Sequence, residues 1–149
     1  MTLIRVTKKF DFEMAHALYE YDGLCRTVHG HSYKLDVTVI GTPISEKGHK
    51  KLGMVIDFSD FKKIVKELIV DVYDHSLVIS HWENLEALGN NRGLFHRVHV
   101  VDYQPTCENM IVHFAKILKQ ALPDYISLHS IKMHETANSF AEWFASDQN

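Results

Sequence analysis

Three histidines and one cysteine near the N-terminus have the residue types and spacing of a metal-dependent reaction centre. The stretch CRTVHGHSY contains Cys25, His29 and His31, and His16 precedes it. Three neutral imidazoles with an open fourth position are the ligand set of a catalytic zinc. A structural zinc would need four closed ligands, usually with paired cysteines, and the sequence contains no C-x2-C pair.

Alternation of apolar and polar residues predicts that these histidines lie on two strands. In residues 3–16 the even positions are apolar, with Lys8 as the exception, and this parity continues to His16. In residues 31–41 the odd positions are apolar, and His29 and His31 share their parity. If the two strands form an antiparallel hairpin, the three imidazoles converge at one edge of a buried face, with Cys25 in the connecting loop. The alternative is that each histidine is a hydrogen-bonded, partly buried residue.

Two further sites carry groups that can move or accept protons. Asp74 and His75 directly follow a predicted helix, and a carboxylate beside an imidazole can orient it, although adjacent Asp-His pairs are common by chance. Glu135 shares the parity of Ile131 and Met133, which places a carboxylate on an apolar face. A buried carboxylate needs a partner, and the N–H groups of a ligand could supply one; the alternative is a strand end in solvent.

The elements that must position these residues follow from periodicity and capping. Apolar residues at helical spacing predict a helix that begins at a cap, Asp57 or Ser59, and runs to Val72. Thr106 is a predicted N-cap of a second helix, which Pro123 ends. A strand that contains Ile131 and Met133 and one more strand through Trp143 follow. Residues 76–104 give no clear pattern apart from a turn at GNNRG, so the predicted order is β-β-α-α-β-β in a single domain, residues 1–149.

Composition excludes several classes of protein. The chain has 149 residues, 46% of them hydrophobic, and a net charge of −3, which gives no basic surface for nucleic acid or for a membrane. No apolar run reaches the length of a membrane span, and the N-terminus lacks the apolar core of a signal peptide. We therefore expect a cytoplasmic location, where thiols stay reduced. The two cysteines, Cys25 and Cys107, do not make a disulfide framework.

Six segments, taken in order, resemble the 6-pyruvoyltetrahydropterin synthase / 6-carboxytetrahydropterin synthase family. Any one of them is a modest signal, but all six in order are highly specific, and they cover most of the chain. The segments are FEMAHAL, CRTVHGHSY, GMVIDFSDFK, DHSL, PTCEN and HET.

The resemblance implies an α+β T-fold, in which a four-stranded antiparallel sheet carries two helices on one face. It also implies a homo-oligomeric barrel, commonly a hexamer of two trimers, with active sites between subunits. Its implied site residues are zinc ligands at His16, His29 and His31, proton-transfer groups at Cys25, Asp74 and His75, and contacts to the pterin substrate at Glu135 and, at the start of the second helix, Thr106.

Within the family, the spacing Cys-x3-His-x-His resembles the bacterial queuosine-pathway enzymes. This implies conversion of 7,8-dihydroneopterin triphosphate to 6-carboxytetrahydropterin, with release of acetaldehyde and triphosphate. The segment after Asp74-His75 is longer than in compact members, which keeps 6-pyruvoyltetrahydropterin as the alternative product. Lys8, Lys9 and Arg26 are candidates for binding the triphosphate.

Three other classes are alternatives to this enzyme. GLCRTVHGHSYKLD is close to a cupin metal motif, but two strong amphipathic helices do not suit a nearly all-strand fold. A non-catalytic metal-binding or pterin-binding module would keep the histidines and Glu135 but would have no use for Cys25, Asp74 and His75. A zinc-finger nucleic-acid binder is inconsistent with the charge and the cysteine count.

Overall fold

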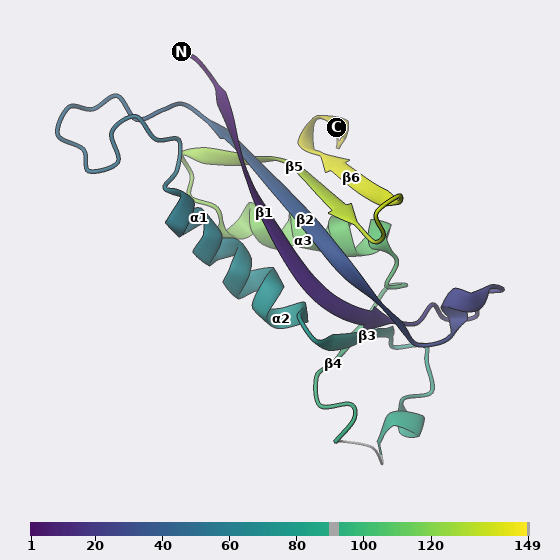
Figure 1. Cartoon of the computed structure of the whole chain (residues 1–149). Helices are drawn as coiled ribbons and strands as arrows, with labels where there is room; N and C mark the ends of the chain where they lie inside the picture. The colour runs from purple at the N-terminus through teal and green to yellow at the C-terminus, as the bar shows by residue number, and fades with distance from the viewer. Residues whose placement is uncertain (90–92, 149) are drawn as a thin grey trace.

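A curled mixed sheet is the central element of the computed structural model, which describes residues 1–89 and 93–148 (Figure 1). Within these residues the spatial order of the strands is β4-β3-β1-β2-β5-β6. The neighbours β1–β2, β2–β5 and β5–β6 are antiparallel, whereas β3 runs parallel to β1 and β4 parallel to β3. The strands are β1 (Ile4–His16), β2 (His29–Gly41), β3 (Ser76–Ser80), β4 (Val98–Val101), β5 (Ile126–His134) and β6 (Phe140–Phe144).

The four strands expected from the sequence are present, but the expected strand count is wrong, because β3 and β4 add a short parallel edge. Both come from residues 76–104, where no pattern was readable. Every residue of β3 is buried, so this strand has no alternation of apolar and polar positions to detect. β4 has only four residues. Residues 90–92 of the expected GNNRG turn lie outside the described part of the chain.

Two helical segments cover one face of the sheet (Figure 1). The first is α1 (Phe58–Val65), which continues through a π-helical turn, Lys66–Val70, into α2 (Asp71–Tyr73), and the second is α3 (Cys107–Ala121). Asp57 caps α1 by accepting a hydrogen bond from Ser59 N, and Thr106 caps α3 by accepting one from Asn109 N. In the described residues, no helix is long and apolar enough to span a bilayer.

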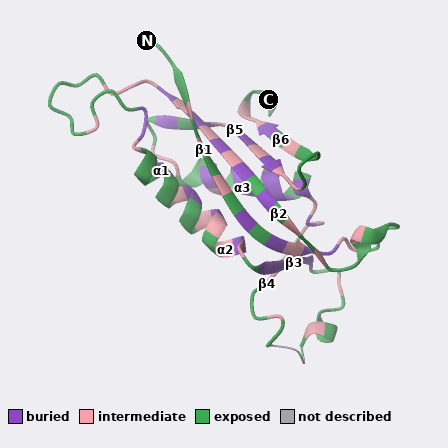
Figure 2. Cartoon of the chain, viewed as in Figure 1, coloured by how far each residue is buried: buried purple, intermediate pink, exposed green. Residues whose placement is uncertain are grey.

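The core lies between the sheet and the helices and follows the parities expected for the first two strands. Phe12 and Met14 of β1, and Tyr33, Leu35 and Val37 of β2, are buried, while the intervening residues face outward (Figure 2). The opposite face of the sheet is polar over most of these two strands. The sheet therefore has one buried face and one largely solvent-facing face, and the three histidines belong to the buried one.

Phe114 of α3 joins the helical layer to the sheet, and its removal should be costly. The ring is fully buried and contacts Phe12 edge-on, with ring centroids 6.3 Å apart. Because Phe114→Ala leaves a cavity in this contact, we expect a loss of about 3–5 kcal/mol in the free energy of unfolding, measured by urea titration. Val112→Ala, on the exposed side of the same helix, is the control and should change stability by less than about 0.5 kcal/mol. Equal losses in the two variants would contradict the packing described.

Candidate metal centre

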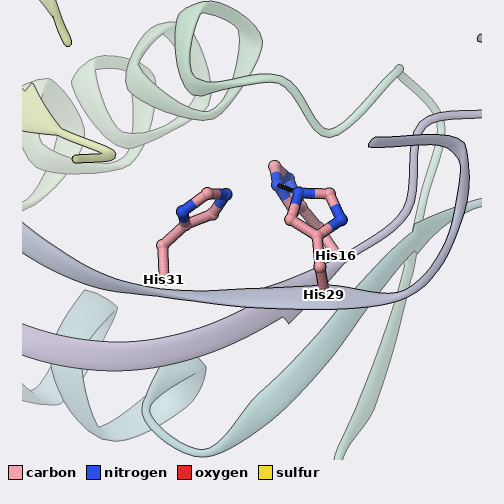
Figure 3. A group of neighbouring side chains, drawn as sticks. All are labelled: His16, His29 and His31. Atoms are coloured by element: carbon pink, nitrogen blue, oxygen red, sulfur yellow. Dashed lines mark hydrogen bonds between the residues drawn. The ribbon is translucent and has the colours of Figure 1, made fainter. Parts of the chain in front are cut away.

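The β1–β2 register brings the three histidines together at the end of the hairpin (Figure 3). His16 pairs directly with His29, and His31 pairs with Met14, so all three side chains leave the same face. One nitrogen from each ring lies within 4.8 Å of the others, and no other such group of His, Cys, Asp or Glu occurs in the described residues. This is the convergence that strand parity predicts.

Backbone carbonyls determine which ring nitrogens face the centre of this cluster. His16 Nδ1 donates to the carbonyl of Pro105, and His29 Nδ1 donates to the carbonyl of Thr27, each at 2.7 Å. A carbonyl only accepts, so in the neutral rings both hydrogens lie on Nδ1 and both Nε2 atoms carry lone pairs. These Nε2 atoms are 3.0 Å apart, and His31 Nε2 is buried without a hydrogen-bond partner. Converging lone pairs repel one another unless a cation lies among them, so the donor set fits a metal ion.

Burial favours the metal-binding form of two of these imidazoles, His16 and His31. Desolvation lowers the pKa of His16, which is almost wholly buried, and also that of His31. A depressed pKa disfavours the imidazolium, and neutral imidazole is the metal ligand. Burial at these two rings therefore favours binding of a metal ion over binding of a proton.

Glu135 lies against the histidine cluster. Its Oε1 is 3.5 Å from His16 Nε2 and 3.8 Å from His31 Nε2, and the side chain is 28% exposed. Glu135 follows the last residue of β5 and keeps the strand's inward parity. A cavity of about 90 Å³ adjoins it, lined by Cys107, Glu108, Glu135, Ser139, Phe140 and Ala141.

Thr106 lies close to the same centre, because it caps α3 directly after Pro105, whose carbonyl holds His16. Cys107 follows it and is a structural thiol. Its Sγ donates to the carbonyl of Met133 at 3.4 Å, and burial raises its pKa to about 12.

Cys25 is half-buried in a short helical turn, Leu24–Arg26, of the loop between β1 and β2. Its carbonyl accepts a hydrogen bond from Leu18 N at 3.0 Å, which holds the loop against the end of β1. It is not a member of the three-histidine group. This is the loop position that the sequence predicts.

Asp74 and His75 lie on the other side of the sheet from the histidines. Asp74 Oδ1 accepts from Glu13 N at 2.8 Å, and this bond, followed by the contact with His75, lowers the pKa of Asp74. His75 Nδ1 is 3.0 Å from Asp74 Oδ2, and its side chain is 77% exposed. His75 lines a cavity of about 560 Å³ that His31 also borders, together with Glu13 and Ser32, whose side chains point away from the buried face.

Tyr33 is a site residue that the sequence reasoning placed only in the core. Its ring lies 5.6 Å from that of His31, and its hydroxyl is buried without a hydrogen-bond partner. Burial, followed by the negative charge of Glu135, raises the pKa of this phenol. The signal was available, since Tyr33 shares the parity of His29 and His31. The roles of the Thr27 and Pro105 carbonyls could not be predicted from the sequence, because every residue type has a backbone carbonyl.

Comparison with known proteins identifies a family model and relatives that match most of this chain. The sequence model of the 6-pyruvoyl tetrahydropterin synthase family matches residues 5–146. The 6-carboxy-5,6,7,8-tetrahydropterin synthase of Haemophilus influenzae is 36% identical over 143 residues, which cover 95% of this chain and 99% of that protein. The enzyme of the same name from Synechocystis is 32% identical, over 94% of this chain and 92% of its own length.

Solved structures share the fold. An uncharacterized protein from Wolinella succinogenes superposes with a TM-score of 0.80 at 20% identity, over 97% of this chain and 99% of that chain. The 6-pyruvoyl tetrahydropterin synthase of Caenorhabditis elegans superposes with a TM-score of 0.67 at 21% identity, over 97% of both chains. The fold is therefore that of these synthases.

If the three histidines hold a metal, removal of one should release it. His29→Ala loses one of three ligands, so we expect the purified variant to contain less than about a tenth of the zinc of the wild type, measured by atomic emission. The control is His49→Ala, in an exposed loop, which should retain the full amount. A His29→Ala protein that is folded by circular dichroism and retains full zinc would exclude this site.

Proposed function

The chain belongs to the 6-pyruvoyl tetrahydropterin synthase family, and we propose that it is a zinc-dependent cytoplasmic lyase acting as a single domain, residues 1–149. The proposed reaction converts 7,8-dihydroneopterin triphosphate to 6-carboxy-5,6,7,8-tetrahydropterin, with release of acetaldehyde and triphosphate, in queuosine biosynthesis. The names of its relatives support the product, and the cluster of three histidines is the structural observation that carries the proposal.

The donor set favours zinc, because three imidazole nitrogens with an open position suit this ion. When bound, zinc supplies a Lewis acid that acidifies the C–H bond beside the substrate's side-chain hydroxyls. In this proposal, the residues around the cluster bind and orient the substrate. Glu135 offers two carboxylate oxygens to the ring and amino N–H groups of the pterin, and Thr106 lies at the adjoining helix start.

Proton transfer is assigned to Cys25 and to the Asp74–His75 pair. A thiolate near a cation is a usable base, and the loop of Cys25 leads directly into His29. Asp74 is held as a carboxylate by Glu13 N–H and orients His75, whose exposed imidazole can deliver or accept a proton.

The positions of these groups support an active site between subunits. The histidines and Glu135 occupy the buried face, while His75 opens toward the opposite face. We therefore infer that the second set comes from a neighbouring subunit. The sheet also has open edges for assembly, because β3 covers β1 only at Met14–His16 and β6 has no outer neighbour among the described strands. Pairing of one edge with the other edge of the next copy closes a ring.

The three cations considered for the triphosphate all have partners within the chain. Lys9 pairs with Asp36, Lys8 lies over the ring of Phe58, and Arg26 pairs with Glu83. Arg26 adjoins Cys25, and we propose it as the triphosphate contact of the three.

Product analysis tests the reaction. Incubation with 7,8-dihydroneopterin triphosphate should give 6-carboxytetrahydropterin by mass spectrometry, together with acetaldehyde detected by an alcohol dehydrogenase assay. Formation of 6-pyruvoyltetrahydropterin without acetaldehyde would assign the chain to the other branch. Zinc removal by a chelator should abolish either product, and restored zinc should recover it.

Mixed oligomers test the division of the site between subunits. Cys25→Ala should retain zinc and lose about 10²–10⁴-fold in turnover, and His75→Ala should lose a similar factor. When the two variants are co-expressed and assemble at random, about a quarter of the sites receive both intact groups, so about a quarter of wild-type activity should return. If both groups act from one chain, the mixed sample stays inactive. Zinc loss in Cys25→Ala would instead make the thiol a ligand.

A further inference from the structure

Gly30 lies between two of the three histidines, yet neither its backbone nor its packing within the chain requires a glycine. Its φ is outside the left-handed region, which among the glycines only Gly48 and Gly53 occupy. A methyl group added at its Cα would meet, apart from its chain neighbours, only the carbonyl oxygen of Met14, at an ordinary contact distance of 3.5 Å. A strand glycine often marks a place where a ligand or another backbone approaches closely.

The other glycine of β2, Gly41, has a structural reason. A methyl group there would lie 3.0 Å from Cγ2 of Ile126 and 3.1 Å from Cγ1 of Val55, and both of these residues are buried. Ordinary contacts between carbon atoms are longer, roughly 3.5–4.0 Å. Glycine in a strand interior is less stable than alanine. Packing accounts for this loss at Gly41, whereas no contact within the described chain accounts for it at Gly30.

The space above Gly30 is the cavity of about 560 Å³ that His75 lines. Gly30 pairs with Ala15 across the β1–β2 ladder, and by strand parity both positions face away from the histidine cluster. Ser32, two residues further along β2, lines the same cavity and donates a hydrogen bond to Glu13 Oε2 at 2.7 Å. The floor of the cavity therefore includes two opposed positions with almost no side chain, close to an exposed imidazole.

The polar groups around the cavity suit a hydroxylated and phosphorylated chain. Because the hydroxyl of Ser32 donates to Glu13, its oxygen and the carboxylate oxygens can accept hydrogen bonds from the hydroxyl groups of a ligand. Arg97 adds a permanent positive charge, and His75 and His96 add two imidazoles. The side chain of the proposed substrate carries both hydroxyl and phosphate groups.

We propose that Gly30 keeps this cavity open for the side chain of a substrate whose pterin ring is held at the histidine centre of a neighbouring copy. This role rests on the proposed function, because it requires a site divided between two copies. A Cβ at position 30 would occupy space that the reacting carbons need, and a displacement of about 1 Å can cost roughly 10²-fold in rate. Although two proposed metal ligands flank Gly30 in the sequence, it belongs to the half of the site that contains His75.

Substitution of Gly30 should change activity and stability in opposite directions. Gly30→Ala should lower kcat/KM for 7,8-dihydroneopterin triphosphate by at least about tenfold, and Gly30→Val by about 10²-fold or more. Both variants should keep their zinc, because the added side chain points away from the histidines. Both should unfold at an equal or higher urea concentration, because a strand glycine is replaced. Wild-type kcat/KM in Gly30→Val, or loss of zinc in Gly30→Ala, would overturn the proposal.

Gly41→Ala is the matched control, since it is the same change in the same strand. It should unfold at a lower urea concentration, because its methyl group meets Ile126 and Val55. The folded variant should keep kcat/KM within about twofold of the wild type, because Gly41 lies at the opposite end of β2 from Gly30. An equal loss of kcat/KM in Gly41→Ala and Gly30→Ala would contradict a specific role of the cavity.

Mixed oligomers determine to which half of the site Gly30 belongs. Gly30 and His75 line one cavity of one chain, so Gly30→Val co-expressed with His75→Ala should stay inactive. Gly30→Val co-expressed with Cys25→Ala should return about a quarter of wild-type activity, because random assembly places an intact cavity against an intact Cys25 in about a quarter of the sites. The opposite pattern would show that the substitution acts through the metal ligands on either side, and would overturn the proposal.

The outcomes distinguish failure of this role from failure of the proposed function. Equal turnover by the wild type and Gly30→Val would overturn only the role of Gly30. Turnover by the wild type with no recovery in either mixture would overturn the division of the site between copies, and the role of Gly30 with it. No turnover of 7,8-dihydroneopterin triphosphate by the zinc-loaded wild type would contradict the proposed function itself.

Discussion

The register between β1 and β2 is the constraint on which the histidine centre depends. His16 faces His29 across this ladder, and a slip of one residue would turn the side chains of one strand to the opposite face. The register is enforced by burial, since Phe12 and Tyr33 form a directly opposed pair whose rings stack at 5.3 Å. The apolar residues of the hairpin thus determine where the three imidazoles lie. The stability of the hairpin and the geometry of the site therefore depend on the same packing.

The Nε2 lone pairs of His16 and His29 face one another, which is unfavourable without a cation between them, and two backbone carbonyls hold the rings in this orientation. His16 donates to Pro105 at the start of α3, and His29 donates to Thr27 within its own hairpin. The first bond joins the sheet to the helical layer, so the packing of α3 also determines the orientation of a ring in the centre. The unsatisfied hydroxyl of Tyr33 at the same place is a further polar group that the core tolerates.

The sequence predicted those parts of the structure that have a local period. Alternation gave β1 and β2 and the inward direction of His16, His29 and His31, and capping side chains gave the helix starts at Asp57 and Thr106. Glu135 was reached because it continues the parity of β5 by one position. The parallel strands β3 and β4 could not be predicted, because they are short and pair with segments distant in sequence. The face of the sheet toward which Asp74 and His75 point could not be predicted either. The helix before them interrupts the period of two that relates side-chain direction from one strand to the next.

The segment without a readable pattern positions the Asp74–His75 pair. Arg97, just before β4, and His99, within β4, donate to the carbonyl of Val72 at 2.9 Å and 2.8 Å, respectively. These two bonds hold the end of α2. Beyond that end, the side chain of Asp74 and the N–H of His75 bond to the two backbone groups of Glu13, and His75 adopts a left-handed backbone with φ of 56°. Such a conformation costs free energy in a residue other than glycine and persists only where neighbours enforce it. The fold therefore stabilises a strained turn to direct His75 away from the histidine centre, which is useful to the proposed reaction only if another copy of the chain receives it.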